Sequence, residues 1–178
     1  MRKEVRIAGF GGQGVILAGI VVAQAAGVYE GKEVAQTQSY GPEARGGAAR
    51  CDVVISDGRI LYPKVRKPHV LLCMSQPALD RYAGECDDGC VLILDSTLVE
   101  AWPRERRVAL VPATAIAEEE LGNRMAANMV MLGALARVHD VVGLESLRRA
   151  IGDVVSPRFR DLNLRAIQTG YERVKMAP

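Results

Sequence analysis

Residues 5–26 read VRIAGFGGQGVILAGIVVAQAA, and this stretch decides how the chain begins to fold. The apolar run 5–8 predicts a β-strand, and the apolar, alanine-rich run 15–26 predicts a helix. The glycines between them allow a sharp turn with positive φ and the close approach of a ligand or another backbone. The sequence therefore predicts a strand, a tight glycine turn and a helix whose first amides face an open space.

A helix N-terminus of this kind has unpaired N–H groups and a partial positive charge, so it suits a phosphate or a carboxylate. The spacing of residues 9–14 also matches the dinucleotide fingerprint G-x-G-x-x-G. That fingerprint requires an acidic residue about 20 positions later, after the second strand. The expected second strand, 34–38, ends without a carboxylate, and Glu30 and Glu33 precede it. NAD binding and a purely structural packing role for the glycines stay open as alternatives.

Composition indicates an ordinary globular protein. The chain has 178 residues, of which 49% are hydrophobic, and the interpretation is a single domain spanning residues 1–178. With 23 basic and 21 acidic residues, no strong field favours nucleic acid or an anionic membrane. No apolar run approaches the roughly 20 residues that span a bilayer, and the first residues lead into a strand instead of a signal peptide. We therefore expect a cytoplasmic protein without a nucleic-acid or membrane partner.

The four cysteines do not predict a metal site. Only Cys86 and Cys90 are close in sequence, and the C-x-x-C pairs of zinc and iron–sulfur sites are absent. Cys51 and Cys73 fall in apolar, strand-like runs, where a free cysteine behaves as a small hydrophobic residue. We expect no metal ligands in this chain.

The remaining pattern alternates between strands and helices. Apolar runs predict strands over 48–56, 69–74, 90–95 and 107–111, and Asp57-Gly58 predicts a two-residue turn that pairs 48–56 with a partner strand over 59–62. Helices are expected over 76–83, 114–121, 123–138, 144–151 and 161–174, with Thr114 capping the second. This order predicts an α/β fold with a Rossmann-like, mostly parallel sheet, flanking helices and an inserted antiparallel hairpin.

The helix expected over 123–138 has an apolar stripe. The apolar residues of this stripe are three or four positions apart, a spacing typical of a buried helix face. They are Met125, Met129, Leu132 and Leu135. These four side chains are predicted to lie in the core.

The loop after the second strand reads TQSYGPEARGG over residues 37–47 and is rich in residues with special roles. Loops at the carboxyl ends of strands are where α/β proteins bind ligands. Gly46 and Gly47 permit close approach, Arg45 offers a planar fork for phosphate or carboxylate, and Glu43 can pair with Arg45 or orient it. The alternative is a solvated turn with an incidental arginine.

Neither histidine has a neighbouring nucleophile in the sequence. His69 is expected at the surface end of a strand and His139 in the turn after a helix. Ser39 and Ser56 lack a context such as G-x-S-x-G. We therefore assign no catalytic residue to this chain and do not expect an independent hydrolase.

Several motifs together resemble the gamma subunit of 2-oxoacid:ferredoxin oxidoreductases over about residues 4–170. They are GFGGQGV (9–15), SYGPEARGG (39–47), VVISD (53–57), YP (62–63), LLCMSQ (71–76), DS (95–96) and NMVMLG (128–133). The run over 39–47 is most like the 2-oxoglutarate branch, and the pyruvate and branched-chain branches stay open.

The resemblance implies a subunit of an enzyme that decarboxylates a 2-oxoacid on thiamine diphosphate, passes electrons through iron–sulfur clusters to ferredoxin, and leaves an acyl-coenzyme A. It places thiamine diphosphate and the clusters mainly on other subunits, so that this chain alone holds no cofactor. The expected partners are the alpha and beta subunits, with a ferredoxin-like delta subunit as a further candidate. The isolated chain is also a candidate to form a homodimer.

The resemblance also carries binding over to two loops that help to enclose the coenzyme A side of the active centre. The matching residues are Gly11, Gly12, Gln13 and Gly14 in the first loop, and Ser39, Tyr40, Glu43, Arg45, Gly46 and Gly47 in the second. The competing interpretations are a free-standing NAD-dependent oxidoreductase and a nucleotide-binding regulatory module.

Overall fold

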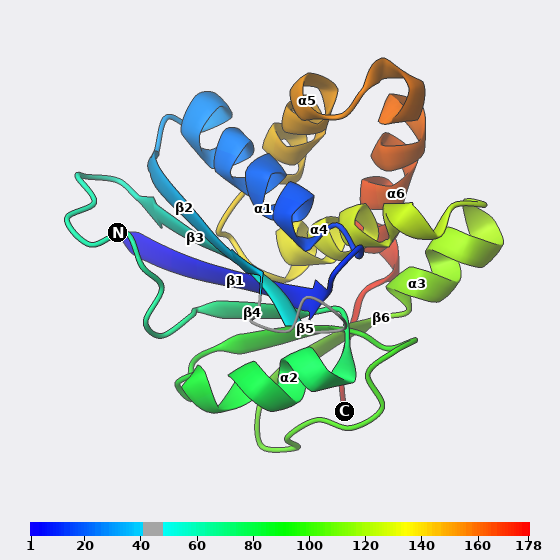
Figure 1. The fold of residues 1–178 in the computed structure, drawn as a ribbon, viewed down its shortest axis with the longest axis horizontal. Helices are drawn as coiled ribbons and strands as arrows, with labels where there is room; N and C mark the ends of the chain where they lie inside the picture. Colours follow the sequence, from blue (N-terminus) through cyan, green and yellow to red (C-terminus); the bar gives the residue numbers. More distant parts are fainter. Residues whose placement is uncertain (41–47) are drawn as a thin grey trace.

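A computed structural model of the chain describes residues 1–40 and 48–178, which form one central mixed sheet of seven strands (Figure 1). The strands are β1 (Arg2–Phe10), β2 (Glu33–Tyr40), β3 (Ala48–Ser56), β4 (Val70–Cys73), β5 (Val91–Asp95), β6 (Arg107–Val111) and β7 (Lys175–Met176). Across the sheet they follow the order β2-β3-β1-β4-β5-β6-β7.

Four neighbouring strands, β1, β4, β5 and β6, run parallel to one another. β3 is antiparallel to both β1 and β2, and the short β7 is antiparallel to β6. The predicted α/β class, with a parallel core and additional antiparallel strands, is confirmed.

Helices cover both faces of this sheet. They are α1 (Val15–Gln24), α2 (Gln76–Tyr82), α3 (Ala113–Ala115), α4 (Ala127–Val138), α5 (Leu144–Val154) and α6 (Arg160–Arg173). Wider π-type turns extend α1 over Ala25–Tyr29 and α3 over Ile116–Glu120, and 3₁₀ turns span Ala83–Glu85, Arg124–Ala126 and Pro157–Phe159. α2 packs below the sheet in Figure 1, whereas α1, α4, α5 and α6 lie above it. No helix in the described part of the chain is long and apolar enough to cross a membrane.

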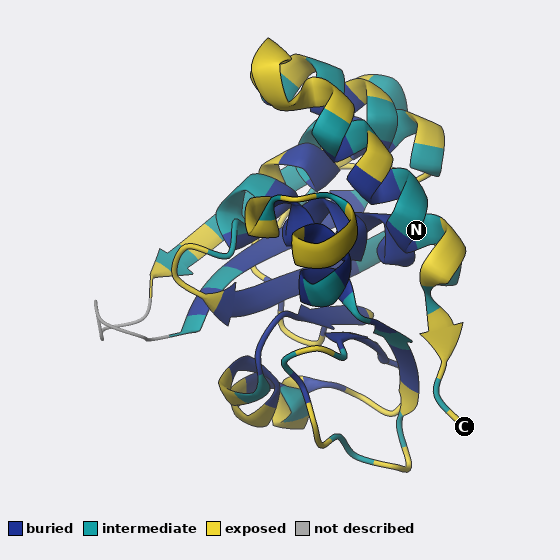
Figure 2. Cartoon of the chain, turned by 90° about the vertical axis from the view of Figure 1, so that its right-hand side faces the viewer, coloured by how far each residue is buried: buried dark blue, intermediate teal, exposed yellow. Residues whose placement is uncertain are grey.

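The parallel strands are apolar on both faces because each face is covered. Leu72 and Ile93 belong to the core between the sheet and the helices α1 and α4. Leu71 and Leu92 belong to the core between the sheet and α2. Figure 2 shows the central strands as buried and the outward surfaces of the helices as exposed or intermediate. This burial explains why the strand runs are continuously apolar instead of alternating.

Two glycines let α4 and α6 cross with their backbones in contact. A Cβ at Gly133 would lie 2.0 Å from the carbonyl oxygen of Ile167, and a Cβ at Gly170 would lie 1.8 Å from that of Val130. Any side chain at either position would force the helices apart.

The predicted hairpin between 48–56 and 59–62 is wrong. β3 pairs with β1 on one side and β2 on the other, and residues 59–62 form no strand. Both edges of β3 are therefore occupied by strands that precede it in the sequence, and the segment after Asp57 leaves the sheet. The antiparallel pair of consecutive strands in this fold is instead β2 with β3.

Two details of the helix predictions are also wrong. Met125 lies in the 3₁₀ turn before α4 and is 60% exposed, whereas Met129 and Leu132 are buried. Thr114 lies inside the first turn after Pro112, so it does not cap the helix by itself. The buried Asp95 at the end of β5 performs this role, because its carboxylate accepts hydrogen bonds from the Thr114 amide at 3.2 Å and hydroxyl at 2.6 Å.

Candidate functional site

The glycine loop joins β1 to α1 at the carboxyl end of the parallel strands. Gly12 has φ of +88° and Gly14, the N-cap of α1, has φ of +74°. Both values lie in the left-handed region that glycine adopts at little energetic cost. The predicted strand, tight glycine turn and helix are confirmed.

The side chain of Gln13 holds this loop in place. Its Oε1 accepts a hydrogen bond from the Phe10 amide at 2.6 Å, and its Nε2 donates one to the carbonyl of Met74 at 3.0 Å. Both ends of the side-chain amide are therefore engaged within the protein. Gln13 was predicted as a binding residue, and its visible contacts are those of a residue that shapes the loop.

Asn128, in the first turn of α4, holds the other end of the loop. Its Nδ2 donates a hydrogen bond to the carbonyl of Gly14 at 3.1 Å, and its Oδ1 accepts one from the Met129 amide at 2.8 Å. Asn128 is 2% exposed. Sequence reasoning did not select it as a site residue, although a polar residue on an otherwise apolar helix face was a signal for it.

The middle of the loop faces open space. A Cβ built at Gly11 or Gly12 meets no heavy atom within 4 Å. The loop backbone at Gly11 and Gly12 can therefore be approached closely by a bound group. The partial positive charge at a helix N-terminus favours an anion at this place.

A cavity of about 330 Å³ adjoins the loop. It lies between the first turns of α1 and α4 and the connection from α5 to α6. Its walls combine apolar side chains with three asparagine amides and one hydroxyl. The lining residues are Gly14, Leu17, Asn123, Met125, Ala126, Asn128, Val154, Val155, Ser156, Phe159, Leu162 and Asn163. This volume falls within the range of small-molecule sites.

The second predicted loop begins at the same edge of the sheet. Tyr40 of β2 pairs with Ala49 of β3, and Ala49 pairs with Gly9 of β1. At the usual strand spacing, the backbones of Tyr40 and Gly9 are about 10 Å apart. Ser39 is partly buried and Tyr40 is 69% exposed. The structure thus brings the starts of both loops together, while Glu43, Arg45, Gly46 and Gly47 lie outside the described residues.

The remaining titratable candidates lie away from the loop. His69 Nδ1 accepts a hydrogen bond from the Glu4 amide at 3.1 Å, at the opposite end of β1. All four cysteines are buried, as expected for Cys51 and Cys73, and burial raises the pKa of the Cys51 thiol to about 11. Among the described residues, no group of three or more His, Cys, Asp or Glu side chains is placed to hold a metal ion.

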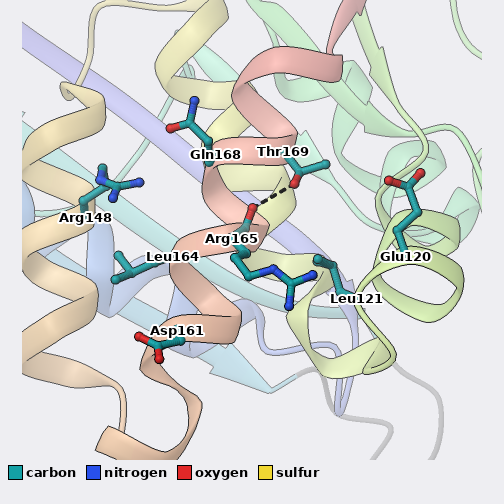
Figure 3. Close-up of a pocket in the computed structure, with 8 residues that line it drawn as sticks. All are labelled: Glu120, Leu121, Arg148, Asp161, Leu164, Arg165, Gln168 and Thr169. Atoms are coloured by element: carbon teal, nitrogen blue, oxygen red, sulfur yellow. Dashed lines mark hydrogen bonds between the residues drawn. The ribbon is translucent and has the colours of Figure 1, made fainter.

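A shallow depression of about 680 Å³ lies on the outer surface between α5, α6 and the turn after α3 (Figure 3). Arg148, Asp161 and Arg165 line it, and the Thr169 hydroxyl donates a hydrogen bond to the Arg165 carbonyl at 2.8 Å. None of the glycine-loop residues lines this depression. The glycine loop and its adjoining cavity are the better candidate site because they combine exposed backbone amides with a partly enclosed volume.

Comparison with known proteins identifies the family. A family model described as pyruvate ferredoxin/flavodoxin oxidoreductase matches residues 4–173. A 2-oxoglutarate synthase subunit KorC from Methanocaldococcus jannaschii is 48% identical over 178 residues, covering 98% of this chain and 95% of that protein. The KorC subunit from Methanothermobacter thermautotrophicus is 50% identical over 181 residues, covering 98% and 96%.

A solved structure agrees with the sequence relatives. The gamma subunit of a keto/oxoacid ferredoxin oxidoreductase from Geobacter sulfurreducens superposes with a TM-score of 0.89 at 38% identity. The match covers 97% of this chain and 96% of that subunit. The resemblance seen in the sequence is thereby confirmed, and the chain belongs to the pyruvate ferredoxin/flavodoxin oxidoreductase family.

Proposed function

We propose that this chain is the gamma-type subunit of a multisubunit oxidoreductase that oxidatively decarboxylates 2-oxoglutarate, forms an acyl-coenzyme A and passes the electrons to ferredoxin. The observation that carries the proposal is that KorC subunits from two organisms are 48% and 50% identical to this chain over 98% of its length. The choice of 2-oxoglutarate rests on the names of these relatives and on the loop sequence over 39–47.

The chain's own contribution is a preformed anion-binding surface. Gln13 and Asn128 fix the glycine loop from two sides, so that the amides around Gly11 and Gly12 are held ready for an acceptor. A phosphate of coenzyme A or a carboxylate of a partner subunit fits this surface by charge. Arg45, Gly46 and Gly47 of the second loop are proposed to contribute from the neighbouring strand end.

The adjoining cavity suits the uncharged part of the same ligand. Asn123 and Asn163 supply amide groups among the apolar side chains of Leu17 and Leu162. A chain of methylene and amide groups would find both apolar contact and hydrogen-bond partners there. We propose that a ligand anchored at the glycine loop extends into this cavity.

Thiamine diphosphate and iron–sulfur clusters are proposed to bind on the other subunits. The described residues provide no group of three or more acidic, cysteine or histidine side chains placed to hold a metal. Cys51 is buried in the core on one face of the sheet, and the other three cysteines are buried in the core on the α2 face. When present in the assembled enzyme, these groups supply the decarboxylation and electron transfer. The residues of this chain are proposed to bind and position coenzyme A and to help enclose the active centre.

The sheet order argues against a free-standing NAD-dependent enzyme. In a dinucleotide-binding fold, the strand beside β1 ends in the acidic residue that holds the ribose. Here the neighbours of β1 are β3 and β4, and β2 lies at the edge of the sheet. β4 is followed by Met74 and Ser75, so no carboxylate follows the parallel neighbour of β1.

Purification from the native source tests the proposal. The tagged chain should co-purify with alpha and beta subunits, and the complex should reduce methyl viologen with 2-oxoglutarate and coenzyme A. With pyruvate or 2-oxoisovalerate as the substrate, kcat/KM should be at least 10-fold lower than with 2-oxoglutarate. A complex that prefers either of these substrates would contradict the substrate assignment, and a chain that purifies alone would contradict the subunit assignment.

A further inference from the structure

The segment that follows β3 is unusually basic. Residues 59–69 read RILYPKVRKPH and contain four arginines or lysines and no acidic residue. The whole chain has a net charge of only +2, so this concentration of positive charge is local. In Figure 1 the segment leaves the sheet beside the N-terminus and returns to β4.

The backbone of this segment is tied to the start of β1. The nearly buried Glu4 carboxylate accepts hydrogen bonds from the amides of Arg66 at 2.9 Å and Lys67 at 3.2 Å. Arg2 bridges the two parts, because it pairs with Glu4 and donates from Nη2 to the Lys64 carbonyl at 3.2 Å. Residues 64–67 are therefore anchored to β1 despite lacking regular secondary structure.

Two large apolar side chains of this segment point outward. Leu61 is 84% exposed and Tyr62 is 42% exposed, while Val65 is only 8% exposed and packs inward. Leu61 and Tyr62 border an open depression of about 430 Å³ that Arg2, Glu4, Arg59 and Arg66 also line. A partner that covers Leu61 and Tyr62 would bury apolar surface that this chain already exposes.

The cations of this surface are available to a partner. Glu4 is engaged by Arg2 and two amides, Asp57 pairs with the N-terminus and Lys32, and Lys67 pairs with Asp87. Within the described residues, no carboxylate pairs with Arg59, Lys64 or Arg66. The Arg66 guanidinium lies 4.3 Å from the centroid of the Tyr62 ring, which positions both groups at the surface.

We propose that the surface formed by Arg59, Leu61, Tyr62 and Arg66 docks this chain onto a partner subunit of its own enzyme. The matching surface of that subunit has an apolar pocket that receives Leu61 and carboxylates that face Arg59 and Arg66. Tyrosine and arginine are enriched at protein interfaces, and the fully buried core of an interface is apolar. This inference rests on the proposed function, which requires partner subunits.

The docking surface is separate from the candidate binding site. It adjoins Arg2 at the start of β1, whereas the glycine loop follows Phe10 at the end of the same strand. At about 3.3 Å per residue, the two ends of β1 are some 25 Å apart. Substitutions at the docking surface should therefore leave the glycine loop unchanged.

The test uses the complete enzyme with a tag on the alpha subunit and measures dissociation of this chain by mass photometry during dilution. Leu61→Asp and the pair Arg59→Glu/Arg66→Glu should each raise the dissociation constant at least 10-fold. Added salt should weaken the wild-type complex and strengthen the complex with the two glutamates, because the charge interaction changes sign. Met176→Asp and Arg104→Glu, an exposed apolar residue and a second arginine over an aromatic ring, are the matched controls.

Three outcomes would overturn the inference. If both docking variants dissociate like the controls, another surface binds the partner, and the proposed function stands. If the wild-type chain does not assemble at all, the proposed function fails and the docking surface fails with it. Tight binding of the free chain to a short RNA, with assembly unaffected by either variant, would assign the basic surface to nucleic acid. Thermal unfolding of each variant verifies folding, and the arginine variant carries the test if Leu61→Asp unfolds.

Discussion

Asn128 and Gly14 are joined by a hydrogen bond although 114 residues separate them in the sequence. The bond runs from the side chain of a buried asparagine on α4 to the carbonyl of the glycine that caps α1. It couples the first turns of two helices, and the candidate cavity lies between them. The shape of the glycine loop therefore depends on α4 as well as on the loop's own sequence.

This coupling predicts non-additive substitutions. A Cβ at Gly14 would lie 2.4 Å from Asn128 Nδ2, and φ there is +74°, so Gly14→Ala should suffer both a steric clash and backbone strain. The strain alone is worth about 1–3 kcal/mol. In an Asn128→Ala background the clash disappears, and Gly14→Ala should become less destabilising by about 1 kcal/mol or more. Urea unfolding of the two single variants and the double variant measures this, and additivity within about 0.5 kcal/mol would contradict the contact.

The Gln13 side chain predicts a difference between two substitutions. Gln13→Ala loses two hydrogen bonds and should destabilise the chain by about 1–3 kcal/mol. Gln13→Glu should be worse at neutral pH, because a carboxylate cannot donate to the Met74 carbonyl and places a negative charge against it. Below about pH 4 the glutamate is protonated and can donate a hydrogen bond again. The difference in unfolding free energy between Gln13→Glu and Gln13→Ala should therefore close. Urea unfolding at both pH values tests this, and a Gln13→Glu variant as stable as wild type at pH 7 would contradict the assigned hydrogen bonds.

The buried ion pair beneath the sheet predicts a large effect of a single substitution. Arg6 donates to both carboxylate oxygens of Asp52, from Nε at 2.8 Å and from Nη2 at 3.0 Å, and both residues are buried. Asp52→Ala should destabilise the chain by about 3–5 kcal/mol, because it leaves a buried guanidinium short of its main partner. The double substitution Arg6→Met/Asp52→Leu should lose much less than the sum of its parts. A double variant as unstable as that sum would show that Arg6 and Asp52 contribute independently, and it would contradict the assigned ion pair.

His139 predicts how stability changes with pH. Burial lowers its pKa, nearby Lys3 lowers it further, and Asp140 opposes both. Its Nδ1 lies 3.2 Å from the Asp140 carboxylate without the alignment of a hydrogen bond. The unfolded chain therefore binds the proton more tightly, so this contribution to stability is complete above the usual histidine range and is lost as pH falls below about 6.5.

The matching experiment compares wild type with His139→Gln. As the pH is lowered below about 6.5, protonation of His139 in the unfolded chain should lower the free energy of unfolding of wild type by up to about 1.4 kcal/mol per pH unit. The variant should lack this component of the slope. Equal slopes for the two proteins between pH 7.5 and 5.5 would show that the histidine ionises freely in the fold.

Local patterns in the sequence were sufficient for most elements. The strand 107–111 has the predicted bounds, and the helix after the glycine turn begins at the predicted residue, Val15. Both predictions follow from continuous apolar runs, which are read from neighbouring residues. The helices over 144–154 and 160–173 begin within one residue of their predicted starts. Each of these features is determined within a few residues of the chain.

The errors occur where distant residues decide the structure. The Asp57-Gly58 turn signal is local, but β3 pairs with β1 and β2 instead of with residues 59–62. Local patterns predicted these strands but not which of them pair. Asp95 caps α3 from 19 residues away, a contact that spacing cannot reveal. Asn128 was missed as a site residue for the same reason, since its role depends on α4 reaching the glycine loop.

The subunit assignment is tested by omitting this chain from the enzyme and then adding it back. The alpha and beta subunits, with thiamine diphosphate and reconstituted clusters, are assayed for acyl-coenzyme A formation from 2-oxoglutarate with and without this chain. The account predicts little or no product from the other subunits alone, none from this chain alone, and restored turnover when they are combined. Full turnover without this chain, or any turnover by this chain alone, would contradict its assignment as a structural and coenzyme-binding subunit.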